Sequence, residues 1–556
     1  MKWKKLEHNG ILFPPDFETK KIKIKIKGES VDLEINQEEM IYQWAKKKDT
    51  PYAQDKVFQK NFVADFAKTF GKKYKKLELD DVDFKNAFNL VDKEKDAKEL
   101  LTKEEKKALA AKRKELREEM KVKFGTGKMD GNEVEIANYM AEPPGIFIGR
   151  GEHPLRGKWK PKVTSKDVTL NLGKEAKVPV GNWGKIVHDQ ESMWMASWTD
   201  YLTQKRKYVW LADTAGIKQD RDKAKYDKAK MLAKEIETIK NKIVKDMQNK
   251  DPKVRRISTV CWLIYRTAMR VGDEKDPDEA DTVGATTLRK EHVTLTSDAI
   301  KFDFLGKDSV RWQETVPAVG NDKQFHENLK ELTAKIKPAD EIFGNLTSRD
   351  VNEYYKTVVK GLTAKVFRTF SASTVVSKYL NENGDVKKGS QMEKLYHAKL
   401  ANLEAAIMCN HKRTIPKTFE QSLQKKRDTL KTAEKATPWK KNEEVLKKAE
   451  STKTKTDAQE KKRKERITKI KGMIKKSKAK QKERVEKLRL QLDLTEKTRD
   501  YNLGTSLRNY IDPRIFKSWT DEVTADWEKL YTAALQKKFL WVKSENESWQ
   551  NVSKHY

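Results

Sequence analysis

The N-terminal part of the chain alternates between strand-like and helical patterns. In residues 21–35, apolar and polar side chains alternate around Gly28, which predicts a basic β-hairpin. Residues 100–125 carry Glu and Lys at helical spacing after a threonine cap and end at Gly125, which predicts an exposed helix. Residues 141–163 are rich in proline and glycine, so we expect mostly loop there, and a surface that contacts a ligand.

The middle of the chain predicts helices around one group of strands. Residues 253–275 contain an apolar run that predicts a mostly buried helix ending at Gly272. Residues 292–316 predict three short strands, with the last turn at 305–308. Two further helical patterns follow, in residues 361–373 and 393–413.

A long charged segment precedes the C-terminal part. Between Trp439 and Asp512 there is no proline, and residues 451–490 hold 17 Lys or Arg against 5 acidic residues, a net charge of +12. The few apolar residues recur at helical spacing: Ile467, Ile470, Ile474, Val485, Leu488 and Leu492. This thin apolar seam predicts an antiparallel two-helix coiled coil projecting into solvent, and a disordered basic linker is the alternative. A compact C-terminal segment should follow.

Length and composition place the chain in the class of multidomain proteins. At 556 residues it is too long for one hydrophobic core, so two or three domains are expected. The longest apolar stretch, Val260–Ile264, is too short to cross a membrane, and the first residues lack the apolar segment of a secretory signal. The 2 cysteines cannot form a disulfide scaffold or a zinc site by themselves. We therefore expect an intracellular protein.

The charge balance points to a polyanionic partner. Lys and Arg total 119 against 85 Asp and Glu, which gives a net charge of +34. The 14 Trp, 16 Tyr and 19 Phe supply a folded core, so the chain is not simply disordered. A basic protein with an aromatic core most often binds nucleic acid, and an anionic membrane surface is the weaker expectation. A soluble lysine-rich protein without such a partner is the remaining alternative.

Several kinds of catalytic site have no motif in the sequence. There is no GxxxxGK[ST] loop, no HExxH, no paired cysteines and no dense carboxylate cluster. Cleavage of nucleic acid would thus require neither ATP nor a metal. Such chemistry needs cations that hold the phosphate oxygens, a nucleophile and an acid for the leaving oxygen. The candidates for these roles are Arg270, Lys307, Arg368, His411 and Tyr510.

Each candidate also has an ordinary explanation. Arg270 at a helix C-terminus would interact favourably with the helix dipole, and Lys307 would be an exposed turn lysine. Arg368 and His411 would be satisfied polar groups near a core, and Tyr510 would be a packing residue. Spacing alone does not join five residues that are spread over so much of the chain.

Long motifs in one order connect them. The chain resembles eukaryotic DNA topoisomerase I, the type IB enzymes, in the segments AMRVGDEK, DTVGATTLR, FDFLGKDSVRW, LTAKVFRTFSAS, CNHKRTIPKTFE and LGTSLRNYIDPRI. The similarity extends to KWKKLEHNGILFPP, EPPGIFIGRGEHP, KVPVG and SWTD, and so covers nearly the whole chain.

The resemblance implies a catalytic set of Arg270, Lys307, Arg368, His411 and Tyr510. The tyrosine would attack a DNA phosphodiester and remain joined to the 3′ phosphate, and the freed strand would swivel and be resealed. Arg270, Arg368 and His411 would stabilise the transition-state charge, and Lys307 would protonate the 5′ oxygen. Neither ATP nor a metal would be required, and divalent cations would at most stimulate the reaction.

The resemblance also implies contacts to double-stranded DNA. Arg150, Asp308, Thr505 and Asn509 would lie at the cleavage site, in the pocket where camptothecin-like poisons stack. Backbone contacts that position the duplex would come from Lys207, Tyr208, Lys218, Lys225, Thr282 and Lys365.

The implied fold is α+β and multidomain. A mixed α/β cap lobe would span residues 1–215, and a mainly α catalytic lobe with a small antiparallel sheet, like that of tyrosine recombinases, would span 216–415. A coiled-coil linker (416–496) and a C-terminal domain carrying the tyrosine (497–556) would follow. The loops 151–155 and 276–280 would be the opposing lips of a clamp around supercoiled DNA. The protein would be a monomer without a membrane association.

Two features depart from the family. Met1 leads almost directly into the core, as in a compact viral or trimmed form without the long N-terminal region that carries targeting signals in nuclear members. From the resemblance we expect a nuclear protein, or one of a viral replication compartment or virion if it is virus-encoded. The basic run 461–464 would be a nuclear signal or simply solvated charge. Phe370 stands where tyrosine is expected, which changes nothing catalytic. A tyrosine recombinase and a non-catalytic basic DNA-binding coiled-coil protein are the two alternatives.

Overall fold

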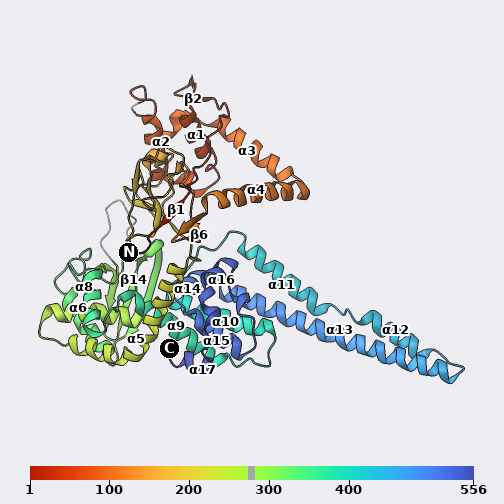
Figure 1. Ribbon diagram of the computed structural model, residues 1–556. Helices are drawn as coiled ribbons and strands as arrows, with labels where there is room; N and C mark the ends of the chain where they lie inside the picture. The colour runs from red at the N-terminus through yellow and green to blue at the C-terminus, as the bar shows by residue number, and fades with distance from the viewer. Residues whose placement is uncertain (75, 273–281) are drawn as a thin grey trace. The chain divides into compact units, whose positions relative to one another are not determined.

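The computed structural model describes residues 1–74, 76–272 and 282–556, apart from the side chain of Asp308 (Figure 1). The predicted lip at 276–280 lies outside these residues. The described chain divides into two compact units. The first unit contains residues 1–222, 282–283 and 304–311, and the second contains 223–272, 284–303 and 312–556. The fold is mixed α/β, with several small sheets and one long helix.

One part of the first unit is a small sheet of three strands with three helices. Strands β2 (Ile24–Ile26) and β3 (Glu29–Val31) pair antiparallel, which confirms the predicted hairpin. Its turn contains Gly28 at φ +83°, a conformation that only glycine adopts at no cost. Strand β4 (Val82–Asp83) pairs with the other edge of β2, and helices α1 (Ile35–Ala45), α2 (Lys56–Lys68) and α3 (Lys85–Leu100) complete this part.

A larger sheet of seven strands forms the rest of the first unit's core. The order is β1-β5-β6-β12-β11-β9-β10, antiparallel except for the parallel pair of β9 and β10. The strands are β1 (Leu6–His8), β5 (Thr126–Met129), β6 (Asn132–Ala137), β9 (Thr169–Asn171), β10 (Lys185–Val187), β11 (Trp194–Thr199) and β12 (Arg206–Leu211).

Two further predictions for the first unit are confirmed. Helix α4 (Lys103–Phe124) is capped by Thr102 and ends at Gly125, and it buries none of its residues. Residues 141–163 form loop apart from the short strands β7 (Gly145–Ile146) and β8 (Trp159–Lys160).

The predicted helix of the middle region is shorter than expected. Helix α6 (Pro252–Thr267) is buried as predicted, but it ends at Thr267 and not at Gly272. Ala268 takes a left-handed conformation at φ +51°, and the next residues pair with a distant segment. The amides of Ala285 and Thr286 donate to the carbonyls of residues 270 and 271, at 2.8 and 2.7 Å. Arg270 therefore lies in a non-helical segment after α6, and its placement at a helix end is wrong.

The three strands predicted for 292–316 are confirmed. They form a sheet in the order β13 (Val293–Leu295), β14 (Ala299–Gly306) and β15 (Val310–Pro317). A single turn of 3₁₀ helix, Lys307–Ser309, connects the last two strands.

Helices make up most of the second unit. They are α5 (Gly216–Asp246), whose first residues belong to the first unit, α7 (Asn321–Thr333), α8 (Ser348–Val358), α9 (Ala364–Asn383), α10 (Gln391–Met408), α14 (Leu503–Asn509), α15 (Pro513–Glu522), α16 (Ala533–Lys538) and α17 (Trp549–Ser553). The remaining 3₁₀ turns are Pro51–Gln54, Leu79–Asp81, Ser165–Asp167, Lys290–His292, Trp527–Leu530 and Leu540–Ser544.

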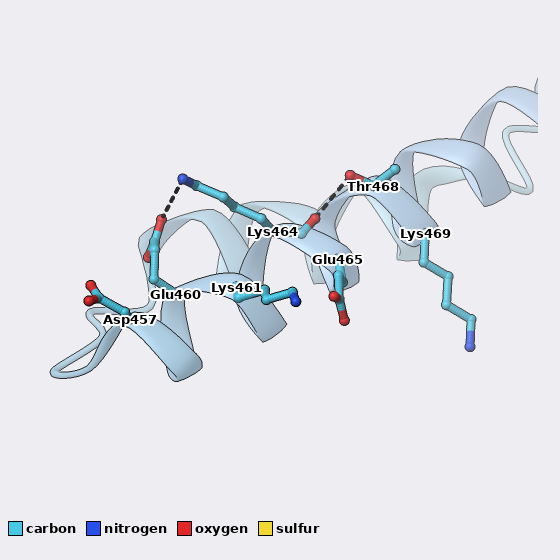
Figure 2. A pocket seen from close by; sticks show the side chains of 7 residues that line it. All are labelled: Asp457, Glu460, Lys461, Lys464, Glu465, Thr468 and Lys469. Atoms are coloured by element: carbon cyan, nitrogen blue, oxygen red, sulfur yellow. Dashed lines mark hydrogen bonds and ion pairs between the residues drawn. The ribbon is translucent and has the colours of Figure 1, made fainter.

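The charged segment forms one long helix against two shorter ones. Helix α13 (Asp457–Lys497) runs along α11 (Phe419–Lys435) and α12 (Lys440–Ser451) (Figure 1). Ile470 and Ile474 are buried against Ala449. The start of α13 carries an open concavity lined by charged and polar groups, in which Lys464 pairs with Glu460 at 3.8 Å (Figure 2). None of its lining residues belongs to the predicted catalytic set.

Two other features are absent from the described residues. None of the described helices is long and apolar enough to cross a membrane. The same residues contain no group of three or more His, Cys, Asp or Glu side chains that could hold a metal ion.

Candidate active site

Four of the five predicted catalytic residues meet in the second unit, around the side chain of Tyr510. Arg270 lies close enough to the Tyr510 side chain for the tyrosine to favour its charged form. The guanidinium carbon of Arg368 lies 5.1 Å from the centre of the tyrosine ring. The His411 ring is stacked on the same ring, with centroids 5.3 Å apart and planes inclined by 28°. Residues from three other parts of the sequence thus surround one phenol group.

The fixed position of Arg368 results from two backbone carbonyls. Arg368 is only 6% exposed on the buried side of α9. Its Nη1 donates to the carbonyl oxygen of Ala268 at 2.6 Å, and Nη2 donates to that of Cys409. These carbonyls follow the ends of α6 and α10, where helical carbonyls have no intrahelical partner. The guanidinium therefore joins two helix ends and is held beside Tyr510.

The segment that carries Arg270 is held by a close backbone crossing. Gly272 passes so near Gly284 that a Cβ atom on Gly284 would lie 2.6 Å from the Gly272 nitrogen. No side chain fits at either position unless one of the two backbone segments is displaced. Burial, and next the charge of Arg368, lower the pKa of Arg270, while the interaction with Tyr510 opposes that shift. The positive charge of Arg368 thus acts against the positive charge of Arg270.

His411 follows the last turn of α10 and is joined to the tyrosine segment through its backbone. Its amide donates to the carbonyl of Ala406 at 2.8 Å, and its carbonyl accepts from the amide of Asn502 at 2.7 Å. The next residue, Lys412, forms an antiparallel bridge with Tyr501. This connection places the histidine and the start of α14 side by side.

The His411 ring is buried beside two positive charges. Burial, followed by Arg368 and Arg270, lowers the pKa of His411 to about 3. The imidazole is therefore neutral at physiological pH, with one N–H donor and one acceptor nitrogen. Neither ring nitrogen has a hydrogen-bond partner among the described residues. The ring can donate a hydrogen bond to a group placed beside Tyr510.

Tyr510 lies at the C-terminal end of α14. Its amide still donates to Ser506 at 2.9 Å, and its ring is half-buried against the C-terminal core. Two guanidinium groups and a neutral imidazole beside a phenol can hold the oxygens of a phosphodiester that the phenol attacks. This arrangement can support transesterification, with Tyr510 as the nucleophile.

Lys307, the fifth predicted residue, belongs to the first unit. Its side chain is exposed in the turn between β14 and β15. The same turn lies against the loop that follows Arg150. A Cβ atom on Gly151 would lie 2.7 Å from the Cβ of Ser309, and Gly151 has φ +58°. Glycine is therefore required where the predicted lip 151–155 passes the lysine turn.

The predicted DNA contacts are divided between the units. Arg150, Lys207, Tyr208, Lys218 and Thr282 belong to the first, as does Asp308, whose side chain is not described; Lys225, Lys365, Thr505 and Asn509 belong to the second. Tyr208 is 39% exposed on β12 between Trp194 and Trp210. Lys207 pairs with Glu142 at 3.5 Å, and Lys218 pairs with Asp213 at 3.7 Å.

Three of these residues have environments that the sequence did not indicate. Thr282 is buried, with 7% of its surface exposed. Lys225 donates to the carbonyl of Asn509 at 3.2 Å and covers the Tyr226 ring at 3.9 Å. Lys365, at the start of α9, is exposed.

Sequence reasoning missed a set of buried groups beside Tyr510. Ser373 of α9 contacts the backbone on the C-terminal side of the tyrosine. Asp512 and Arg514 form a buried ion pair at 2.8 Å in the residues that follow. The Asp-Pro pair at 512–513 was a signal for a capped helix start, but nothing in the sequence connected Ser373 to it.

Comparison with known proteins agrees with the geometry. Residues 1–211 match the family described as "Eukaryotic DNA topoisomerase I, DNA binding fragment", and residues 214–445 match "Eukaryotic DNA topoisomerase I, catalytic core". Residues 482–551 match a "C-terminal topoisomerase domain".

Individual relatives align with nearly the whole chain. DNA topoisomerase 1 beta of Arabidopsis thaliana is 36% identical over 97% of this chain and 58% of its own length, so the chain spans little more than half of that relative. DNA topoisomerase 1 of Homo sapiens is 33% identical over 97% of this chain and 71% of its own length. DNA topoisomerase 1 of Candidozyma auris is 33% identical over 99% of this chain and 83% of its own length. On this similarity, the chain belongs to the eukaryotic DNA topoisomerase I family.

Proposed function

We propose that this chain is a type IB DNA topoisomerase, which relaxes positive and negative supercoils by cutting and resealing one strand. The observation that carries the proposal is the convergence of Arg270, Arg368 and His411 on the Tyr510 side chain. One guanidinium over the ring would suit a packing tyrosine, whereas two guanidinium groups and an imidazole beside the phenol suit a nucleophile that attacks a phosphodiester.

In the cleavage step the Tyr510 oxygen attacks a DNA phosphorus. The bond from phosphorus to the 5′ oxygen breaks, and a 3′-phosphotyrosyl bond replaces it. Arg270 and Arg368 hold the non-bridging oxygens as negative charge collects on them, and neutral His411 donates its N–H to one of them. The phenol proton leaves to solvent, and the departing 5′ oxygen takes up one proton.

Resealing is the same exchange in reverse. The 5′ hydroxyl attacks the phosphotyrosine after the broken strand has swivelled about the intact one. Each step exchanges one phosphate ester for another, so no net hydrolysis occurs and no ATP is consumed. We therefore propose that neither ATP nor a metal is required, and that divalent cations at most stimulate the reaction.

Lys307 is our candidate for the acid that protonates the 5′ oxygen. It is exposed in a hairpin turn, which is a suitable element for reaching into a DNA groove. An ammonium group there could supply a proton to the leaving oxygen.

The remaining assignments extend this proposal to the whole chain. A cap lobe (1–215), a catalytic lobe (216–415), a coiled-coil linker (416–496) and a C-terminal domain (497–556) would enclose double-stranded DNA as a monomeric clamp. Arg150, Asp308, Thr505 and Asn509 would border the cleavage site, where camptothecin-like poisons stack. We propose a nuclear location, or a viral replication compartment if the protein is virus-encoded.

Plasmid relaxation tests the proposal directly. The chain is incubated with negatively supercoiled plasmid in EDTA without ATP, beside the variants Tyr510→Phe and Tyr501→Phe. Tyr501 is the matched control, because its ring packs against the cluster of Leu400 and Leu403 and it is not one of the predicted catalytic residues. Relaxation by the parent and by Tyr501→Phe, with none by Tyr510→Phe, is expected.

The other outcomes separate the alternatives. Relaxation by Tyr510→Phe would show that the nucleophile is another group. If no variant relaxes the plasmid but all retard it in a gel, the chain is a non-catalytic DNA-binding protein. Exchange of strands between two duplexes, in place of relaxation, would indicate a tyrosine recombinase.

A further inference from the structure

The backbone that follows Tyr510 is held by a buried hydroxyl. Ser373 is fully buried on α9, the helix that also carries Arg368. Its Oγ accepts from the amide of Asp512 at 3.0 Å and donates to the carbonyl of Tyr510 at 3.4 Å. One side chain therefore bridges both peptide groups that flank Ile511.

The next residues are fixed by a buried ion pair. The Asp512 carboxylate is fully buried and accepts from the Arg514 amide, from Arg514 Nε and from Arg514 Nη2, at 2.9, 3.1 and 2.8 Å. The Tyr556 hydroxyl donates to the same carboxylate at 2.7 Å. Because all these donors lie in the protein, the carboxylate is satisfied without solvent, and its position is fixed.

Helix α5 holds the segment from another side. Asp227 accepts from Arg514 Nη1 at 2.6 Å, and Lys225, two residues earlier, donates to the carbonyl of Asn509 at 3.2 Å. Contacts from α5 and α9 thus reach the peptide groups on both sides of Tyr510. By contrast, the tyrosine side chain itself is only half-buried and projects toward the catalytic groups.

We propose that Ser373, with the Asp512–Arg514 pair, acts as a tyrosine clamp that positions Tyr510 for attack in line with the leaving oxygen. The inference rests on the proposed function, because it assigns positioning residues to that reaction. None of the three groups contacts the reacting atoms. They act by fixing the backbone from which the nucleophile extends, and a displacement of about 1 Å can lower such a rate by roughly 100-fold.

The α9 helix itself provides a matched control. Ser377 lies one turn after Ser373, is equally buried, and its hydroxyl has no hydrogen-bond partner among the described residues. Ser373→Ala and Ser377→Ala therefore remove the same atom from the same helix, but only the first removes a contact to the tyrosine backbone.

The experiment measures DNA cleavage and backbone protection separately. Cleavage is followed in a single turnover on a duplex whose cut strand releases a short piece, so that resealing cannot occur. We expect Ser373→Ala to cleave roughly 10- to 100-fold more slowly at saturating DNA, with a Kd for DNA unchanged when measured in the Tyr510→Phe background. Ser377→Ala should cleave at the parent rate.

Hydrogen exchange of the DNA-free protein gives a readout independent of activity. The peptide 507–516 should exchange faster in Ser373→Ala, because the Asp512 amide loses its acceptor, and should be unchanged in Ser377→Ala. If Ser373→Ala does not fold, Tyr556→Phe removes one donor to Asp512, and the same peptide and the cleavage rate should respond, less strongly.

The outcomes that overturn the inference differ from those that overturn the function. A parent-like cleavage rate in Ser373→Ala, or an equal loss in Ser377→Ala, would overturn the clamp while plasmid relaxation by the parent still supports the function. Unchanged exchange of residues 507–516 would also overturn the clamp. Failure of the parent to relax plasmid, with the exchange difference intact, would instead overturn the proposed function.

Discussion

At the scale of single residues, the charge state of His411 determines what it can contribute. Its pKa is lowered to about 3 by burial and by Arg368 and Arg270. The unfolded chain binds a proton at this ring below its ordinary pKa of 6.5, whereas the folded protein does not. The free energy of unfolding contributed by this group is therefore fully present above pH 6.5 and decreases as the pH falls toward 3.

We predict that His411 does not become protonated between pH 8 and 5 in the DNA-free protein. Ring ¹⁵N shifts measured by NMR should remain those of a neutral imidazole over this range. Replacing one neighbouring charge, in Arg270→Gln, should raise the pKa of His411, because that guanidinium is one cause of the depression. A midpoint near 6.5 in the parent would contradict the prediction, because the ring would then become a cation as the pH falls from 8 to 5.

The sequence predicted the catalytic residues only through their resemblance to a family. Arg270, Arg368, His411 and Tyr510 come from distant positions, and no spacing rule brings them together. Ser373 could not be predicted at all, because a serine on the buried side of a helix looks like any other packing residue. Its partner, the Tyr510 carbonyl, lies 137 positions away and is a backbone group that every residue possesses.

At the scale of elements, sequence patterns predicted a helix or hairpin correctly where contacts between neighbouring residues fix its ends. The hairpin at Gly28 and the capped helix α4 are fixed by neighbouring residues, and both were predicted. The end of α6 was not, because it is set by pairing of residues 270–271 with 285–286. The sequence predicted that Gly272 ends the helix, whereas in the structure this glycine allows the backbone of Gly284 to approach closely.

The interruption between α11 and α12 has a similar origin. Helix α11 ends at Lys435 before Pro438, and the Ala433 carbonyl accepts from the amide of the cap residue Ala436 at 3.2 Å. Gln481 of α13, only 7% exposed, donates its side-chain amide to that carbonyl. Lys478, one turn earlier, lies 5.4 Å from the Trp439 ring and pairs with Glu443 at 2.8 Å. A side chain of the long helix thus bridges the break in the opposite arm.

We predict that Gln481→Ala loosens the helical arm at this break. The Ala433 carbonyl keeps its hydrogen bond from the Ala436 amide in this variant, so losing the second donor should cost about 0.5–1.5 kcal/mol and act locally. Hydrogen exchange of residues 430–445 should accelerate, while exchange of residues 503–522 remains unchanged. The exposed neighbour Lys482 provides the control variant Lys482→Ala, which should leave both regions as they are. If residues 430–445 exchange as slowly in Gln481→Ala as in the parent protein, the side-chain amide has no such role.

At the scale of the whole molecule, the charge of +34 should govern affinity for DNA. Each phosphate that a lysine or arginine neutralises releases condensed counterions. For every such phosphate, the logarithm of the binding constant therefore falls by roughly 0.9 for each tenfold increase in salt concentration. Many charges of this chain are already paired within the protein, however. Lys387, for example, pairs with Glu522, whereas Lys365 is exposed at the start of the helix that carries Arg368. Net charge therefore overstates the number of phosphate contacts.

Comparing these two lysines tests whether position or charge alone governs binding. Lys365→Ala should weaken binding to all DNA sequences alike and reduce the slope of log K against log salt by about 1, because one phosphate contact is lost. Lys387→Ala removes the same charge but should leave the slope unchanged. Fluorescence anisotropy with a labelled duplex, titrated at several salt concentrations in the Tyr510→Phe background, measures both slopes without cleavage. If both variants change the slope by the same small amount, DNA binding depends on the overall charge, and Lys365 makes no phosphate contact.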